Sequence, residues 1–213
     1  MEFFIYNTMA KKKEIFKPIE NGKVSLYTCG PTVYDFSHIG NFRTFVFEDL
    51  LKRWLLHLGY DVTHVMNITD VDDKTIKKSI SLNLGLEKIT KKYISEFMSD
   101  ISWLNLHPAD YFPRATDHVP DMISMIDSLI KNKMAYAGED GSIYFDISSF
   151  KDYGKLANVK FTKDQKNSLI GLQDEYKSNS PQDFALWKAR KTNDGDVFWD
   201  SPWGQGRPGW HIE

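Results

Sequence analysis

Residues 24–44 read Val24-Ser-Leu-Tyr-Thr-Cys29-Gly-Pro-Thr-Val-Tyr-Asp-Phe-Ser-His38-Ile-Gly-Asn41-Phe-Arg-Thr44. The residues before Cys29 have the composition of a short β-strand, and the Gly-Pro pair after it ends that strand. Apolar residues then recur at helical spacing at Phe42, Val46, Leu50, Trp54 and Leu58, with Phe47, Leu51 and Leu55 beside them, which predicts a helix with one buried face. Residues 61–69 again have strand composition, so the sequence predicts a strand, a helix and a second strand parallel to the first.

Two polar residues and a glycine occupy the predicted start of this helix. His38 and Asn41 would share the first turn, beside unpaired backbone N–H groups and the positive end of the helix dipole, which attract phosphate. Gly40 leaves space for a nucleotide to lie against the backbone. The residues alone leave a second interpretation open, in which His38 only caps the helix and Asn41 is an ordinary surface residue.

Cys29 is the only cysteine among 213 residues. The chain therefore has no internal disulfide, which is typical of a protein from a reducing compartment. A lone cysteine is most often a small buried apolar residue. This one ends a predicted strand at the edge where a parallel sheet places its functional residues, so a binding role is also open.

Four segments, in order along the chain, resemble the cysteinyl-tRNA synthetases, a family of class I aminoacyl-tRNA synthetases. They are Cys29-Gly-Pro-Thr-Val-Tyr-Asp-Phe-Ser-His38-Ile-Gly, Asn67-Ile-Thr-Asp-Val-Asp-Asp-Lys74, Pro113-Arg-Ala-Thr116 and Ser201-Pro-Trp-Gly-Gln-Gly-Arg-Pro-Gly-Trp-His-Ile-Glu213. The resemblance implies an α/β fold with a Rossmann-like parallel sheet, of which this chain forms the first half. It also implies a smaller α+β connective unit inserted into that fold.

The expected organisation has three parts. Residues 1–116 form the first half of the nucleotide-binding catalytic domain, residues 117–200 the connective insertion, and residues 201–213 return to the catalytic domain. Asp140-Gly141 predicts a hairpin turn within residues 134–147. Residues 151–182 are polar and rich in lysine, which predicts an excursion over the surface.

The resemblance implies that the complete protein activates L-cysteine with ATP and Mg²⁺ and transfers it to the 3′ end of tRNA(Cys). His38 and Asn41 would be catalytic, and Cys29 would be one ligand of a zinc ion whose other ligands lie beyond residue 213. The ATP and adenylate site would comprise His38, Gly40, Asn41 and Thr44. The amino-acid site would comprise Cys29, Gly30, Thr32, Thr69 and Trp210.

Zinc gives such a site a physical means of selecting its substrate. Serine differs from cysteine by oxygen in place of sulfur, a change that packing alone rejects poorly. A zinc ion favours the softer thiolate over a hydroxyl. One residue departs from the family pattern, because Asn41 stands where the family has a second motif histidine; an amide donates hydrogen bonds but carries no positive charge.

The family pattern continues past residue 213, with a Lys-Met-Ser-Lys-Ser loop and anticodon-binding helices, so we expect the isolated chain to be inactive. Two alternatives remain open. One is the cysteine ligase of mycothiol synthesis, which passes cysteine to an amino sugar; Pro31-Thr32-Val33 and Arg43 favour the tRNA enzyme instead. The other is a non-catalytic paralogue that binds a nucleotide or RNA.

The formal net charge of −2 means that any contact with tRNA is local. Candidate lysines are 11–13, 77–78 and 91–92, which are otherwise ordinary solvated residues. Asp70, Asp72 and Asp73 suit either a magnesium site or the capping of a helix over residues 73–81. No apolar run approaches the roughly 20 residues of a membrane span and no signal peptide is evident, so we expect a cytoplasmic protein, and we expect it to be a monomer.

Overall fold

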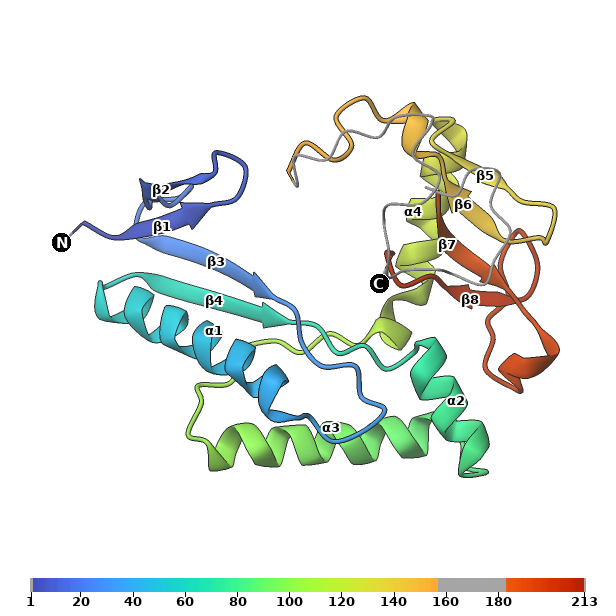
Figure 1. Ribbon diagram of the computed structural model, residues 1–213, viewed down its shortest axis with the longest axis horizontal. Helices are drawn as coiled ribbons and strands as arrows, with labels where there is room; N and C mark the ends of the chain where they lie inside the picture. Colours follow the sequence, from blue (N-terminus) through green and yellow to red (C-terminus); the bar gives the residue numbers. More distant parts are fainter. Residues whose placement is uncertain (1, 157–182, 213) are drawn as a thin grey trace. The chain divides into compact units, whose positions relative to one another are not determined.

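The computed structural model describes residues 2–156 and 183–212 (Figure 1). The chain divides into two compact units, one of them Lys17–His118 and the other Glu2–Phe16 together with the residues from Val119 onward. Most of the predicted surface excursion, residues 157–182, lies outside the described residues. No helix in the described part of the chain is long and apolar enough to cross a membrane.

The first unit is built on the predicted strand, helix and strand. Strand β3 (Lys23–Thr28) pairs in parallel with β4 (Asp61–Met66), and helix α1 (Ile39–His57) packs against both (Figure 1). Residues 110–115 run beside the other edge of β4, where the Met66 N–H donates to the Tyr111 carbonyl at 3.0 Å. Strand β4 is therefore central, and the loops that follow the strands start from one edge of the sheet.

The predicted buried face of α1 is wrong for most of its residues, because Leu55 alone among the predicted apolar residues is fully buried. Val46 and Leu50 are exposed, and Phe47 beside them has 65% of its surface accessible. The helix instead buries Phe45, Glu48, Asp49, Lys52 and Leu55. Charged residues can lie on this face because they have partners in the loop around Pro108, far along the chain. Lys52 Nζ donates to the Pro108 carbonyl at 2.8 Å, and Asp49 accepts the His107 N–H at 2.8 Å. Apolar residues occur on more than one side of α1, so their spacing alone could not identify which side of the helix is buried.

Two further helices complete this unit, α2 (Asp73–Ser81) and α3 (Leu86–Trp103). Helix α2 has the bounds predicted from the sequence, and α3 buries a stripe of Ile89, Tyr93, Phe97 and Ile101. This stripe packs with residues of the sheet, its loops and α1 in one core, whose remaining buried members are Val33, Phe45, Met66, Ile68 and Ala109. A short 3₁₀ helix, Ala115–His118, ends the unit.

The second unit contains a hairpin of β1 (Phe4–Asn7) and β2 (Lys12–Ile15) and a four-stranded antiparallel sheet. Helix α4 (Val119–Lys131) precedes this sheet. The strand order is β5-β6-β7-β8, and two 3₁₀ turns lie between strands. The strands are β5 (Ala135–Ala137), β6 (Ile143–Phe145), β7 (Phe184–Ala189) and β8 (Gly206–Pro208). The predicted hairpin around Asp140-Gly141 is confirmed, because β5 and β6 pair across it.

Strand β8 places part of the last motif in this second sheet. It pairs with β7, and the Gly209 N–H donates to the Leu186 carbonyl at 2.8 Å. A Cβ at Gly209 would lie 1.9 Å from the Ala185 carbonyl oxygen, so only glycine fits against the strand. Residues 206–208 thus share a sheet with residues of the predicted connective insertion, and their predicted return to the catalytic domain stays a prediction.

Candidate active site

Cys29 lies directly after β3, and its thiol is exposed. The next residue, Gly30, packs tightly against the end of β4: its N–H donates to Asn67 Oδ1 at 3.0 Å, and a Cβ would lie 1.8 Å from the Asn67 carbonyl oxygen. The close approach of the two backbones therefore fixes the start of the loop that carries Cys29. The thiol faces solvent rather than filling the interior.

We expect Gly30→Ala to destabilise the first unit strongly. The added methyl group overlaps backbone, which cannot move aside as a side chain can, so the loop must shift at a cost of about 3 kcal/mol. Chemical denaturation followed by circular dichroism measures this loss. Gly85→Ala is the matched control, because Gly85 has φ −60° and nothing lies within 4 Å of its added Cβ. Equal stability of the two variants would contradict the close packing of Gly30.

Thr32 and Thr69 bring the second predicted segment beside the first. The two residues form a parallel bridge, in which the Val33 N–H donates to the Thr69 carbonyl and the Thr69 N–H donates to the Pro31 carbonyl, both at 3.1 Å. Thr69 is buried, and its hydroxyl accepts a hydrogen bond from Asn67 Nδ2 at 3.4 Å. The loop after β3 and the loop after β4 are thereby held together at the carboxyl edge of the sheet.

His38 and Asn41 form a reciprocal capping box at the start of α1. His38 Nδ1 accepts the Gly40 N–H at 3.0 Å, and Asn41 Oδ1 accepts the His38 N–H at 3.1 Å. These bonds use the acceptor atom of each side chain. In the neutral ring the proton then lies on Nε2, so His38 Nε2 and Asn41 Nδ2 are both donors available to a ligand.

Thr44 and Trp210 are the two remaining predicted site residues. Thr44 is exposed on the second turn of α1. Trp210 belongs to the second unit, where 52% of its surface is exposed and its ring centroid lies 5.2 Å from that of His211. The position of Trp210 beside the amino acid stays a prediction.

The aspartates after β4 have structural partners. Asp72 caps α2 by accepting the Lys74 N–H at 2.6 Å, which agrees with the capping interpretation. The buried Asp70 accepts both the N–H and the hydroxyl of Thr116, at 2.9 and 2.6 Å. This pair ties the second motif of the sequence to the third. Within the described ranges no group of three or more His, Cys, Asp or Glu side chains is arranged to hold a metal ion.

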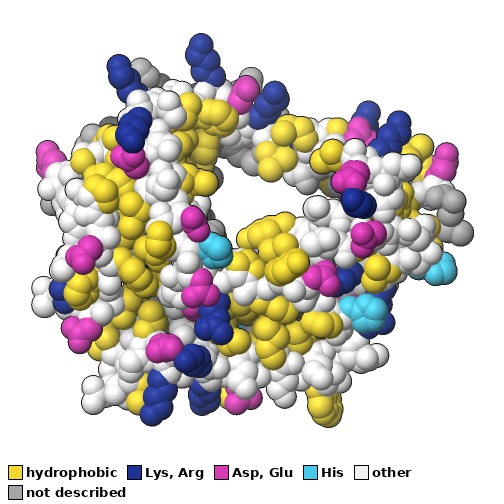
Figure 2. All heavy atoms as spheres, turned by 180° about the vertical axis from the view of Figure 1, so that it is seen from behind, with side chains coloured by type: hydrophobic (Ala, Val, Ile, Leu, Met, Phe, Trp, Pro, Cys, Tyr) yellow, Lys and Arg dark blue, Asp and Glu magenta, His cyan; other side chains and the backbone are white. Residues whose placement is uncertain are grey.

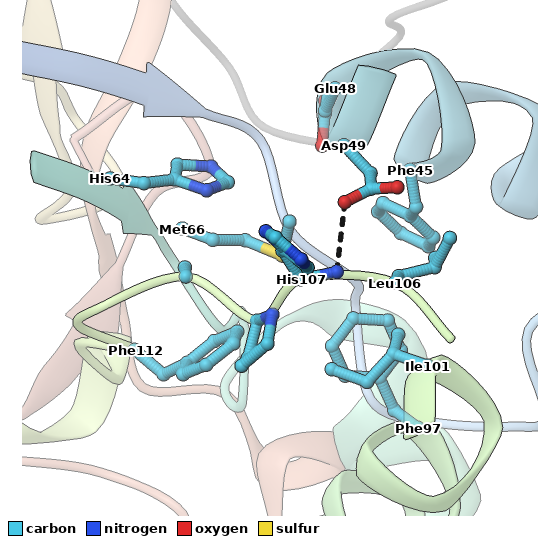
Figure 3. Close-up of a pocket in the computed structure, with 12 residues that line it drawn as sticks. Phe45, Glu48, Asp49, His64, Met66, Phe97, Ile101, Leu106, His107 and Phe112 are labelled. Atoms are coloured by element: carbon cyan, nitrogen blue, oxygen red, sulfur yellow. Dashed lines mark hydrogen bonds between the residues drawn. The ribbon is translucent and has the colours of Figure 1, made fainter. Parts of the chain in front are cut away.

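A cluster of three buried polar side chains, which includes the residue before Cys29, was not identified from the sequence. Thr28 Oγ1 lies 2.9 Å from His64 Nε2, and the Thr28 hydroxyl lowers the pKa of the neighbouring Glu48 carboxyl, against the larger effect of burial. Glu48 and His64, 8% and 2% exposed, line a cavity of about 10 Å³, enough for one water molecule (Figure 3). Glu48 Oε2 and His64 Nδ1 have no hydrogen-bond partner in the described part of the chain. The alternation of Val62, His64 and Met66 along β4 was the one sequence signal that His64 points inward.

We expect Glu48 to make folding stability dependent on pH. Burial raises the pKa of Glu48 above its ordinary value of 4.5. As pH rises from 4.5 to the raised folded pKa, the unfolded chain releases this proton first, so wild-type stability falls across that window. Glu48→Gln carries no ionisable proton, so its stability relative to wild type should rise over the same window in urea titrations. Glu20→Gln, at an exposed position, is the control; a difference that does not vary with pH would contradict the prediction.

Solved structures with a similar fold include the ternary complex of Agrobacterium radiobacter K84 agnB2 LeuRS with tRNA and LeuAMS. The similarity has a TM-score of 0.50 at 20% sequence identity, and it covers 61% of this chain and 17% of that one. At this identity it shows the fold alone. The fold is that of a class I aminoacyl-tRNA synthetase catalytic domain.

The family described as tRNA synthetases class I (C) catalytic domain matches residues 15–213, and the chain belongs to this family. The cysteine–tRNA ligase of Chlamydia muridarum (strain MoPn / Nigg) is 52% identical over 214 residues, covering 100% of this chain and 45% of that protein. The cysteine–tRNA ligase of Brachyspira hyodysenteriae (strain ATCC 49526 / WA1) is 50% identical over 217 residues, with the same coverage of 100% and 45%. The chain thus spans less than half the length of these relatives.

Proposed function

We propose that this chain is the amino-terminal part of a cysteine–tRNA ligase. The enzyme activates L-cysteine with ATP and Mg²⁺ to cysteinyl-adenylate and transfers the cysteine to the 3′ end of tRNA(Cys), as a monomer in the cytoplasm. The observation that carries this proposal is the exposed thiol of Cys29 at the carboxyl edge of the sheet, in a chain 52% identical to a protein of that name.

The start of α1 supplies the groups for adenylate formation. The substrate carboxylate attacks the α-phosphate of ATP and pyrophosphate leaves, so the protein mainly positions the reactants and stabilises charge. His38 Nε2 and Asn41 Nδ2 donate to phosphate oxygens, and the capping box holds both donors in place. Gly40 supports this geometry, because a Cβ there would lie 2.9 Å from the His38 ring. Thr44, one turn further along α1, borders the adenylate in this proposal.

The carboxyl edge of the sheet supplies the amino-acid site. Gly30, Thr32 and Thr69 form its floor through their backbone pairing. In this proposal Trp210 is a further contact of the amino acid in the complete enzyme. Cys29 fits a zinc site as one soft donor, since its thiol is exposed; the other ligands come from residues after 213. When bound, zinc supplies a preference for the thiol of cysteine over the hydroxyl of serine.

The acceptor distinguishes this function from the mycothiol ligase. A full-length protein that carries this chain is given labelled cysteine, ATP and either tRNA or glucosaminyl inositol. We expect labelled cysteine on tRNA only, and no cysteine-dependent ATP–pyrophosphate exchange by the isolated 213-residue chain. Transfer to the amino sugar would refute the assignment. So would the absence of any cysteine-dependent exchange by the full-length protein.

A further inference from the structure

Lysines and aromatic rings interleave where the loop before α1 meets α2 and α3. Lys74 Nζ lies 5.3 Å from the centroid of the Tyr34 ring. Lys92 Nζ lies 5.6 Å from the Phe36 ring and 5.2 Å from the Tyr93 ring, and Tyr93 is itself 5.8 Å from Lys78 Nζ. Figure 2 shows Lys and Arg side chains gathered at its lower left, over α2 and the start of α3. We call Tyr34, Phe36, Lys74, Lys78 and Lys92 the lysine–aromatic patch.

The partners of these lysines differ in how much of the positive charge they leave for a ligand to bind. Lys78 pairs with Asp35 at 2.9 Å, so its charge is largely compensated. Lys74 and Lys92 lie over ring faces, which hold an ammonium group without neutralising it. Lys92 also attracts the Asp35 carboxylate that pairs with Lys78, so two ammonium groups face one carboxylate, and the patch as a whole keeps an excess of positive charge for an anion. Phe36 packs edge-on against Tyr93, with centroids 5.4 Å apart, yet 57% of its surface is exposed.

Single-stranded nucleic acid fits this combination. Its phosphates pair with lysines and its unpaired bases stack on exposed rings, whereas an acidic peptide would use the lysines and leave the Phe36 ring uncovered. The chain as a whole has a net charge of −2, so a polyanion has no reason to bind except at such a local cluster. The patch contains one lysine from each of two pairs singled out in the sequence, Lys78 and Lys92, which lie on adjacent helices.

The patch also adjoins the start of α1. Phe36 lies two residues before His38, so a strand bound on Phe36 would have its end next to the groups proposed to hold the adenylate. We propose that the lysine–aromatic patch binds the single-stranded 3′ end of an RNA, with its backbone on Lys74 and Lys92 and a base on Phe36. The identification of this RNA as the tRNA acceptor end rests on the proposed function; the binding itself does not.

Fluorescence anisotropy with the 213-residue chain and a labelled single strand of about eight nucleotides tests the binding. We expect Phe36→Leu to weaken binding by at least about fivefold, through the loss of stacking. Lys74→Ala combined with Lys92→Ala should weaken it further and lower the salt slope by about 1.4, since each phosphate contact contributes about 0.7. Lys23→Ala combined with Lys131→Ala is the control, because these exposed lysines lie on other elements and pair with neighbouring carboxylates.

Wild-type affinity in the patch variants would overturn the proposal, as would equally tight binding of an RNA duplex. In the full-length protein, the same variants should leave cysteine-dependent ATP–pyrophosphate exchange unchanged and raise the KM for tRNA. If the wild-type protein lacks that exchange, the proposed function fails, whatever the RNA affinity. If exchange is present and the KM for tRNA does not change, the patch is wrong and the function stands.

Discussion

Replacing Cys29 with serine is expected to remove most of the selection of cysteine over serine in a full-length protein that carries this chain. A site that engages the distinguishing group directly can discriminate by about 10⁴ to 10⁵, whereas a pocket that relies on packing reaches only about 10². In the proposed site, a zinc ion would lose the soft ligand that Cys29 supplies. We therefore expect a loss of roughly 10² to 10³ in the ratio of kcat/KM values for the two amino acids.

The zinc content of the purified protein is a second readout that does not depend on activity. It should fall in Cys29→Ser, because a hydroxyl is a poor zinc ligand. Thr44→Ser is a matched control, since Thr44 is exposed and has no expected contact with the metal. Full zinc content in Cys29→Ser, together with unchanged selectivity, would show that this thiol is not a metal ligand.

Replacing His38 with alanine is expected to lower kcat for cysteine-dependent ATP–pyrophosphate exchange by about 10² to 10³. That is the usual cost of removing one donor to charge that develops in the transition state. The KM for cysteine should change little, because the proposed role of His38 is to contact phosphate oxygens of ATP and not the amino acid. The same variant also loses the helix cap, at about 0.5–2 kcal/mol of folding stability.

His38→Asn separates the two roles of this residue. Asparagine is a favourable cap, so this variant should recover the stability that His38→Ala loses. Its short side chain does not reproduce the Nε2–H donor, so kcat should stay low. Recovery of kcat together with stability would mean that His38 acts only as a cap, which is the interpretation that the sequence alone left open.

The sequence predicted the strand, helix and strand of the first unit because local signals mark their ends. Gly30-Pro31 stops β3, and His38 with Asn41 caps α1. The buried side of α1 could not be predicted in this way. It depends on Lys52 and Asp49 finding partners in the loop around Pro108, some fifty residues later in the chain. Such long-range pairing leaves no periodic signal.

The residues of the candidate site likewise divide into those that local sequence signals identify and those that depend on long-range packing. Residues that adjoin strand ends or the helix start, such as Cys29, Thr69 and His38, were identifiable from their place in the predicted elements. The Thr28, His64 and Glu48 group was not, because its members come from three elements and all three carry polar side chains at interior positions. The meeting of Lys92 with Phe36 likewise depends on the packing of α3 against the loop before α1.

X-ray absorption at the zinc edge of the full-length protein tests most directly whether Cys29 anchors a metal in a cysteine site. We predict a shell of sulfur ligands that loses one sulfur in Cys29→Ser and, in the wild type, gains one when L-cysteine is added but not when L-serine is added. A sulfur count that neither the substitution nor L-cysteine alters would contradict it.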